Sequence, residues 1–169
     1  MKTLLLMRHG KSSWDDPALA DHDRPLAPRG RKGAALVAKY LRDAGLQPAI
    51  VLCTSAIRAQ ETLEQLRPSF SDSTIIKIEP ELYGAGSNEL ANRIRRLSQA
   101  STSVLVIGHN PAMQELVVTL ATKGRKSNAV REKFPTAALA VLDVRIDQWR
   151  LLEPGRATLR DFVTPKQLR

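Results

Sequence analysis

Residues 3–10 read TLLLMRHG, a short apolar run that ends in an arginine, a histidine and a glycine. Three further runs have the same apolar character: residues 49–53 (AIVLC), residues 103–107 (SVLVI) and, more weakly, residues 74–78 (TIIKI). Continuous runs of this length are typical of strands that are buried on both faces, as in parallel sheets. The four runs therefore predict the strands of a mostly parallel sheet.

Helical patterns alternate with these runs. Apolar residues recur at helical spacing over residues 33–44, over residues 56–66, and again after Ser87 and after Asn110. We expect Ser87 to cap one helix and Asn110 to cap another, with Pro111 in the first helical position. Strands that alternate with helices indicate an α/β domain with helices on both faces of its sheet.

The C-terminal part has a different pattern. Residues 137–144 and 148–153 are joined by a short polar turn, which predicts a hairpin. Leu142, Val144 and Ile146 alternate with polar residues, so we expect one solvated face or an edge position. The predicted fold class is α/β: a three-layer α/β/α arrangement whose central sheet is mostly parallel and includes a C-terminal hairpin.

The composition is that of one globular domain, residues 1–169. Of the 169 residues, 43% are hydrophobic and 25% charged, enough to bury a core without disulfides or metal. Cys53 is the only cysteine, so we expect it to be buried and the protein to be cytoplasmic. The first apolar run is too short for a signal peptide, and none reaches the ~18 residues of a membrane span.

The charge is strongly positive. Lys and Arg number 26 against 17 Asp and Glu, which gives a net charge of +9. A charge of this sign points to nucleic acid, an anionic membrane or phosphorylated ligands. Nucleic acid is disfavoured, because recognition motifs are missing and aromatic residues make up only 4% of the chain. We also expect no membrane partner, which leaves phosphorylated ligands.

Histidines and arginines follow three of the predicted strands: Arg8-His9-Gly10, Thr54-Ser55-Ala56-Ile57-Arg58 and Gly108-His109-Asn110-Pro111. In open α/β sheets, ligands bind beyond the carboxyl ends of the strands, so these residues are expected at one edge. Arginines buried there without carboxylates are costly unless an anion pairs with them. The pattern predicts an anion-handling active site; a metal site at His9 and His109 is the alternative, disfavoured by the adjacent arginines.

The same motifs, in this order, resemble those of the histidine phosphatase (phosphoglycerate-mutase-like) superfamily. They are Arg8-His9-Gly10, the pattern SAxRAxxT at residues 55–62, and Gly108-His109-Asn110-Pro111. Two further stretches, KSSW at residues 11–14 and DxDRPL at residues 21–26, resemble the SixA branch of short phosphohistidine phosphatases. The resemblance extends from residue 1 to about residue 121, and it implies a phosphoglycerate-mutase-like fold.

The resemblance implies a mechanism. His9 is expected to attack phosphorus as a neutral imidazole, forming a phosphohistidine enzyme that water then hydrolyses. Arg8 and Arg58 are expected to bind the phosphoryl oxygens, and His109 to donate a hydrogen bond to one of them. Lys11 is a further phosphate-binding candidate. No metal or other cofactor is expected, because the arginines supply the positive charge.

The general acid is less clear from the sequence. Larger members of the superfamily place a carboxylate after the third strand, and here Glu81 lies near that position without aligning to it. Asp21 and Asp23 are the other candidates. A phosphorylated imidazole can be protonated on its free nitrogen near neutral pH, because the reference pKa of histidine is about 6.5. A missing acid therefore favours a phosphoramidate substrate over an alkyl phosphate.

The expected partner is a phosphorylated protein of the histidine-containing phosphotransfer type. No long insertion is present that could form a lid, and an open pocket suits a phosphorylated side chain on a folded protein. The alternative substrate is a small phosphorylated metabolite or nucleotide, a small phosphate ester. Basic groups at residues 123–133 and 155–169 are candidates for docking an acidic phosphoprotein. We expect a monomer.

Overall fold

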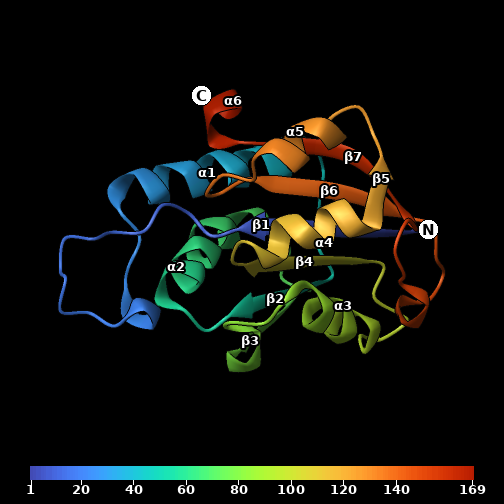
Figure 1. Cartoon of the computed structure of the whole chain (residues 1–169), viewed down its shortest axis with the longest axis horizontal. Helices are drawn as coiled ribbons and strands as arrows, with labels where there is room; N and C mark the ends of the chain where they lie inside the picture. Colours follow the sequence, from blue (N-terminus) through green and yellow to red (C-terminus); the bar gives the residue numbers. More distant parts are fainter.

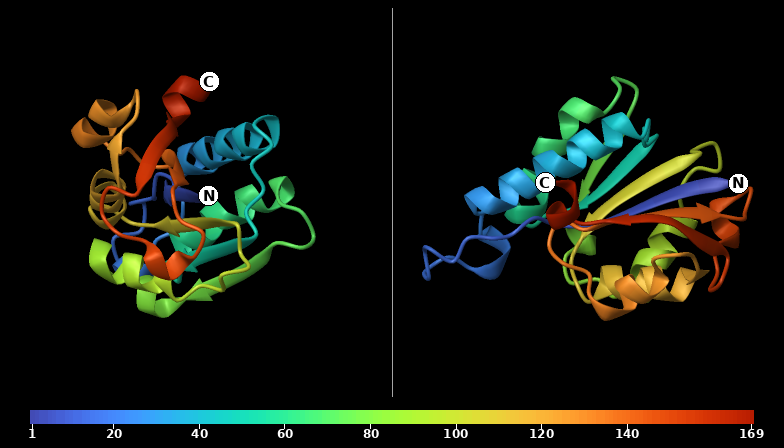
Figure 2. Two further views of the ribbon diagram at one scale, coloured as in Figure 1. Left: turned by 90° about the vertical axis from the view of Figure 1, so that its right-hand side faces the viewer. Right: turned by 90° about the horizontal axis from the view of Figure 1, so that it is seen from above.

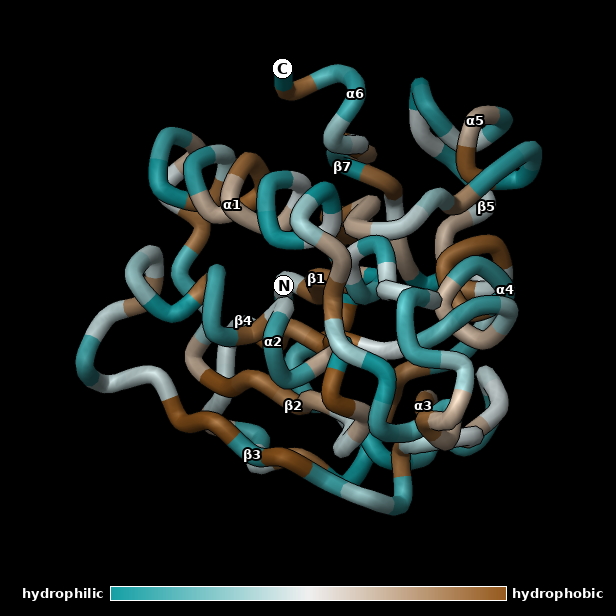
Figure 3. Tube along the Cα trace, turned by 90° about the vertical axis from the view of Figure 1, so that its left-hand side faces the viewer, coloured by the Kyte–Doolittle hydropathy of each residue, from teal (hydrophilic) through white to brown (hydrophobic).

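The computed structural model describes all 169 residues and contains one seven-stranded sheet (Figure 1). The strand order across the sheet is β3-β2-β4-β1-β6-β7-β5. The strands are β1 (Lys2–Arg8), β2 (Ile50–Thr54), β3 (Ile75–Glu79), β4 (Ser103–Gly108), β5 (Ala121–Lys123), β6 (Leu139–Val144) and β7 (Ala157–Val163). The four strands predicted from apolar runs are β1 to β4, and all four are present. Burial on both faces is wrong for β3, because it is an edge strand whose Ile75 and Ile78 are 55% and 42% exposed. Figure 3 shows the hydrophobic residues of β3 at the margin of the trace.

The sheet is mostly parallel, as predicted. Strands β1, β2, β3 and β4 pair in parallel, and β6 pairs antiparallel with both β1 and β7. Strand β5 pairs in parallel with β7, so β6 alone runs against the others. Because β1, β2 and β4 point the same way, their carboxyl ends meet at one edge, beyond which the loop after β1 projects (Figure 1).

Helices cover both faces and complete the predicted three layers (Figure 2). One face packs against α1 (Pro28–Asp43) and α2 (Ile57–Leu66), the other against α3 (Ser87–Arg95) and α4 (Ala112–Leu120). Short helices α5 (Ser127–Glu132) and α6 (Pro165–Leu168) follow later in the chain. Along β1 the side chains alternate between the two cores: Leu4 and Leu6 face α4, whereas Leu5 and Met7 face α1 and α2.

Of the two strands predicted for the C-terminal hairpin, only the first is present. Strand β6 pairs with β7, Ala157–Val163, and not with residues 148–153. Residues Trp149–Leu151 instead form a short 3-10 helix, because the Trp149 ring is fully buried and its Nε1–H donates to the carbonyl oxygen of Ser101 at 2.7 Å. The apolar character of this segment thus reflects packing rather than strand pairing.

Strand β6 lies inside the sheet, between β1 and β7, and not at an edge. Leu142 and Val144 pack into one core, while Leu139 and Val141 pack into the other. The polar Asp143 fits between β1 and β7 because its carboxylate pairs with Arg160 on β7. On the polar side of the alternation Asp143 is partly exposed, and Arg145 and Asp147, which follow the strand, are exposed. The expected solvated face is therefore present at this end of β6.

The helix boundaries differ slightly from those predicted. Helix α1 begins at Pro28 rather than at residue 33, since proline suits the first helical turn. Gly86 and Pro111 occupy the cap positions of α3 and α4, one residue away from the predicted caps. Cys53 is buried in β2, and burial raises the pKa of its thiol to about 12. No helix has the length and apolar character needed to cross a bilayer.

Candidate active site

The strand ends bring two histidines together. Arg8 on β1 lies opposite Gly108 on β4, so the residues that follow, His9 and His109, are neighbours across the pair of strands. Their ring centroids are 5.1 Å apart. Arg58, from the first turn of α2, donates from Nε to Nε2 of His9 at 3.3 Å. The structure therefore brings three of the four predicted catalytic residues, His9, His109 and Arg58, together in one cluster.

His9 is held in one orientation. Only 7% of the residue is exposed, and its Nδ1–H donates to the carbonyl oxygen of Gly10 at 2.7 Å. That hydrogen bond assigns the proton to Nδ1 and leaves the Nε2 lone pair directed toward Arg58. Gly10 is needed here, because an added Cβ would lie 2.8 Å from the carbonyl oxygen of Gly30.

The imidazole of His9 is neutral. Burial lowers its pKa to about 3, and the charges of His109, Arg58 and Arg8 act in the same direction, against the hydrogen bond to Gly10. Imidazolium is disfavoured because charge is costly in a buried, already cationic place. A neutral imidazole with an unprotonated Nε2 is the nucleophilic form of histidine.

Arg58 is anchored by Asp21, from the loop after β1. Its Nη1 donates to the Asp21 carbonyl oxygen at 2.7 Å, and its Nη2 donates to Oδ2 of the same residue at 3.0 Å. Tyr83 donates its hydroxyl to that Oδ2 at 2.6 Å. The hydrogen bond from Tyr83, followed by Arg58 and Arg24, lowers the pKa of Asp21 to about 2, so this carboxylate is ionised.

His109 completes the cluster on the other side. The guanidinium of Arg58 can only donate, so Nδ1 of His109 accepts from Nη2 at 3.4 Å and Nε2 donates to the hydroxyl of Thr54 at 3.3 Å. Burial, followed by the charge of Arg58, lowers the pKa of His109 to about 4. The ring of Tyr83 packs edge-on against it, with centroids 5.5 Å apart.

Arg8 has an unsatisfied donor. Its Nη1 donates to the carbonyl oxygen of Phe134 at 3.0 Å, but its buried Nε–H has no acceptor. Burial lowers the pKa of Arg8, and the neighbouring charge of Arg58 adds to this effect. A buried donor without an acceptor costs free energy that an anion beside it would recover. Two guanidinium groups next to a neutral imidazole form a site suited to a phosphoryl group.

The three candidate acids are in different places. Asp21 alone contacts the cluster. Asp23 contacts His22 at 3.3 Å, and Glu81 is exposed on the turn Pro80–Leu82, where it lines a hollow with Glu89 and Arg93.

Arg24 and Lys11, two further polar residues of the loop after β1, differ in their contacts. Arg24 is buried and donates to Ser13 and Asp21, while Lys11 is exposed. Tyr83 was not among the predicted site residues, and nothing in its sequence context distinguishes it from a packing aromatic.

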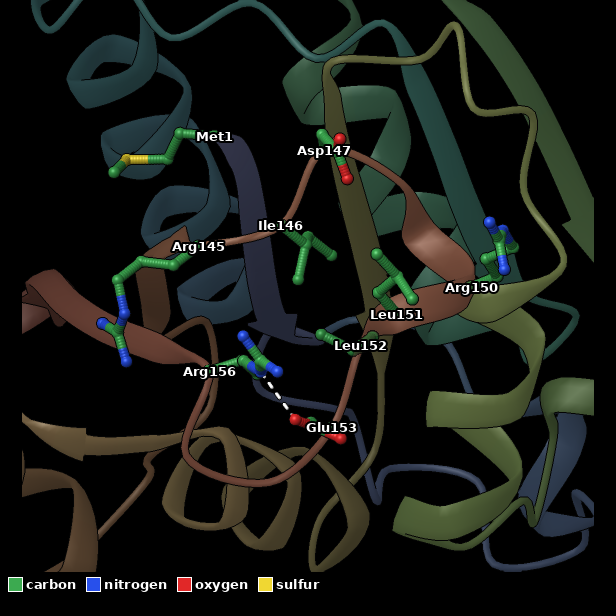
Figure 4. Close-up of a pocket in the computed structure, with 9 residues that line it drawn as sticks. All are labelled: Met1, Arg145, Ile146, Asp147, Arg150, Leu151, Leu152, Glu153 and Arg156. Atoms are coloured by element: carbon green, nitrogen blue, oxygen red, sulfur yellow. Dashed lines mark hydrogen bonds and ion pairs between the residues drawn. The ribbon is translucent and has the colours of Figure 1, made fainter.

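Hollows elsewhere have a different chemistry. The one drawn in Figure 4 lies near Met1, at the opposite end of β1 from His9, and contains no histidine. Its arginine Arg156 is paired with Glu153, and the hollow also contains the carboxylate of Asp147. No group of three or more His, Cys, Asp or Glu side chains is arranged as metal ligands would be. The edge of the sheet around His9 is therefore the candidate active site.

The chain belongs to the histidine phosphatase superfamily. The model of the histidine phosphatase superfamily (branch 1) matches residues 4–84, which include His9 and Arg58. This assigns the chain to a superfamily of phosphatases, in agreement with a buried neutral histidine between arginines.

Within the superfamily the similarity to SixA proteins covers the whole chain. The phosphohistidine phosphatase SixA of Escherichia coli is 28% identical over 168 residues, 98% of this chain and 96% of that protein. The structure of the protein histidine phosphatase SixA complexed with tungstate matches with a TM-score of 0.80 and 25% identity, covering 99% of both chains. An uncharacterized Mycobacterium tuberculosis protein is 40% identical over 166 residues, 95% of this chain and 100% of the relative.

Proposed function

We propose that this protein hydrolyses phosphohistidine on a partner protein, through a phosphohistidine intermediate formed at His9. The observation that carries the proposal is the state of His9: Nδ1–H is held by Gly10, and Nε2 is unprotonated between Arg58 and His109. The similarity to SixA phosphohistidine phosphatases over the full length supports the choice of substrate.

In the first step, Nε2 of His9 forms a bond to phosphorus as the bond from phosphorus to the substrate imidazole breaks. The leaving imidazole takes the electron pair of that bond and departs neutral, because its other nitrogen already holds a proton. Arg8 and Arg58 neutralise the phosphoryl oxygens, and the unsatisfied Nε–H of Arg8 gains an acceptor. His109 lies beside the same oxygens, where the incoming negative charge raises its pKa and favours a protonated donor.

In the second step, water attacks phosphorus and the bond to Nε2 of His9 breaks. Inorganic phosphate leaves, the water proton passes to the phosphate or to solvent, and His9 returns to its neutral state. Since the positive charge of the two arginines stabilises both transition states, we propose that neither a metal nor another cofactor is required.

The proposed reaction needs no carboxylic acid. Asp21 is ionised and its oxygens are held by Arg58, Arg24 and Tyr83, so it has no proton to donate near neutral pH. We assign it the positioning of Arg58. Glu81 and Asp23 have no contact with His9. An imidazole leaves readily without a proton donor, whereas an alkoxide does not, which favours phosphohistidine over alkyl phosphates.

The test is hydrolysis of a phosphohistidine protein by wild type, His9→Ala and His22→Ala. His9→Ala is expected to lose activity, and acid-labile phosphate should be trapped on wild-type His9 after rapid mixing. His22, which contacts Ser55, Asp23 and the ring of Tyr83 but not His9, is the histidine control and should retain far more activity than His9→Ala. Equal turnover of simple alkyl phosphates by the wild type would overturn the substrate assignment in favour of a small phosphorylated metabolite. Unchanged hydrolysis by His9→Ala would overturn the mechanism.

A further inference from the structure

A basic groove lies beside the active site, on the far side of the loop that carries His9. We use the name basic groove for the hollow between the loop after β1, the start of α1, the segment before β6 and the C-terminal segment. Its volume is about 650 Å³. Figures 1 and 2 place α6 next to α1 near the carboxyl ends of the parallel strands. Its cationic lining residues are Lys11, Arg29, Lys32, Lys133, Lys166 and Arg169.

These cations have no partners within the protein. None of the six takes part in an ion pair or donates a side-chain hydrogen bond, and no Asp or Glu lines the groove. Elsewhere on the surface, cations are commonly paired, as Lys39 is with Asp43 and Arg31 with Glu61. Six unpaired cations around one concave surface create a positive potential that attracts and orients an anionic partner.

The groove is continuous with the phosphate site through the backbone. Lys11 follows His9 and Gly10 directly in the chain. Ala137, which lines the groove, donates its N–H to the carbonyl oxygen of His9 at 2.9 Å. The carbonyl oxygen of Phe134, between two lining residues, accepts from Arg8 at 3.0 Å. The groove thus lies within two residues of His9 along the chain and one hydrogen bond away through Ala137, so a folded partner protein that reaches His9 is large enough to reach the groove as well.

We propose that the basic groove docks an acidic segment of the phosphorylated partner protein; this inference rests on the proposed function. A volume of about 650 Å³ is far larger than one phosphate ion and suits several side chains. No aromatic side chain lines the groove, so it lacks the stacking surface that single-stranded nucleic acid uses. Charge complementarity would increase the association rate and select partners with Asp and Glu near the phosphohistidine.

A binding experiment tests the groove independently of catalysis. The probe is a fluorescein-labelled peptide of twelve residues rich in Glu and Asp, measured by anisotropy at low salt. The test variant reverses two groove charges, Lys32→Glu with Lys166→Glu. The control, Lys77→Glu with Arg150→Glu, makes the same change in net charge on exposed residues elsewhere. We expect the groove variant to raise the Kd about 10-fold or more and the control to change it less than about 3-fold.

The outcomes separate the possibilities. Absence of peptide binding by the wild type, or equal loss in both variants, would overturn the proposal. Tighter, groove-dependent binding of a single-stranded oligonucleotide or of anionic phosphatidylserine vesicles would also overturn it, by assigning the groove to another class of partner.

Steady-state kinetics test whether the groove contributes to the proposed reaction. With a phosphohistidine protein that has an acidic surface, the groove variant should raise KM about 10-fold and leave kcat unchanged. With free phosphohistidine, both variants should match the wild type, since neither substituted residue contacts the phosphate site. If the wild type fails to hydrolyse either substrate, the proposed function fails, while the peptide measurement still decides whether the groove binds acidic segments. Equal KM values for all three proteins would overturn docking at the groove.

Discussion

The buried neutral state of His9 predicts a loss of stability in mild acid. In the unfolded chain the imidazole titrates near its reference pKa of about 6.5, whereas in the folded protein its pKa is about 3. Between these values the unfolded state binds a proton that the folded state does not, so the free energy of unfolding decreases as the pH falls. A pH of about 5 lies about 1.5 units below the pKa of the unfolded state. At that pH the free energy of unfolding is therefore lower by about 2 kcal/mol than at a pH where both states are neutral.

The assay compares the wild type with His9→Asn, whose side-chain amide can still donate to Gly10. Urea unfolding at about pH 8 supplies the baseline, because imidazole is neutral in both states there. On going from about pH 8 to about pH 5, the wild type should lose about 2 kcal/mol more than the variant. The contribution of His109 has the same sign but is present in both proteins and cancels. Equal losses in the two proteins would refute the buried neutral His9.

Three further predictions concern the surroundings of the site. Gly30→Ala would place a Cβ 2.1 Å from the carbonyl oxygen of Lys11, and should lower the free energy of unfolding by about 3 kcal/mol in urea titrations. Tyr83→Phe removes the hydrogen bond to Asp21 and should lower kcat/KM for phosphohistidine about 5-fold, the equivalent of about 1 kcal/mol. Arg58→Lys keeps the charge but not the planar donor geometry, and should lower kcat/KM about 100-fold in the same assay.

Each of these three predictions has a control or a result that would contradict it. Gly86→Ala is the control for Gly30→Ala, since the atom nearest to a Cβ added at Gly86 is 3.9 Å away. This variant should lower the free energy of unfolding by less than about 1 kcal/mol. Similar losses in the two glycine variants would contradict the close approach at Gly30. Full activity in Tyr83→Phe would show that Asp21 holds Arg58 without its help, and full activity in Arg58→Lys would show that charge alone suffices.

The sheet was predictable because three of its parallel strands, β1, β2 and β4, are buried on both faces, whereas the edge strand β3 gave the weaker run and is largely exposed. Runs such as residues 103–107 are long enough to be recognised without knowledge of their neighbours, and β4 contains that run. The failure at residues 148–153 has a physical reason: Trp149 is apolar in sequence but is buried through its side chain, with its indole N–H on Ser101. An isolated apolar segment does not reveal whether its burial comes from sheet pairing or from packing.

The clustering of the candidate site residues was predictable where these residues follow strands directly. His9 and His109 meet because the register of β1 and β4 brings their ends together, and position after a strand is visible in sequence. The contact between Asp21 and Arg58 depends instead on how residues 9–27, in which no long insertion was predicted, fold against the start of α2. Tyr83 reaches this contact from 62 residues further along the chain. Loop geometry of this kind has no periodicity, so the sequence marked three carboxylates without distinguishing them.

The positive charges around His9 have a different effect at each of two stages of the proposed reaction. Before the substrate binds, Arg58 and Arg8 add to burial in disfavouring imidazolium, which keeps Nε2 available for attack. Once the phosphoryl group is present, the same guanidinium groups are neutralised by its oxygens, and their effect on His109 is reduced. A single set of charges thus maintains the nucleophile and then stabilises the transferred group. Because Asp21 pairs with Arg58 through Nη1 and Nη2, it orients the guanidinium and offsets part of its charge, while Nε stays directed at His9.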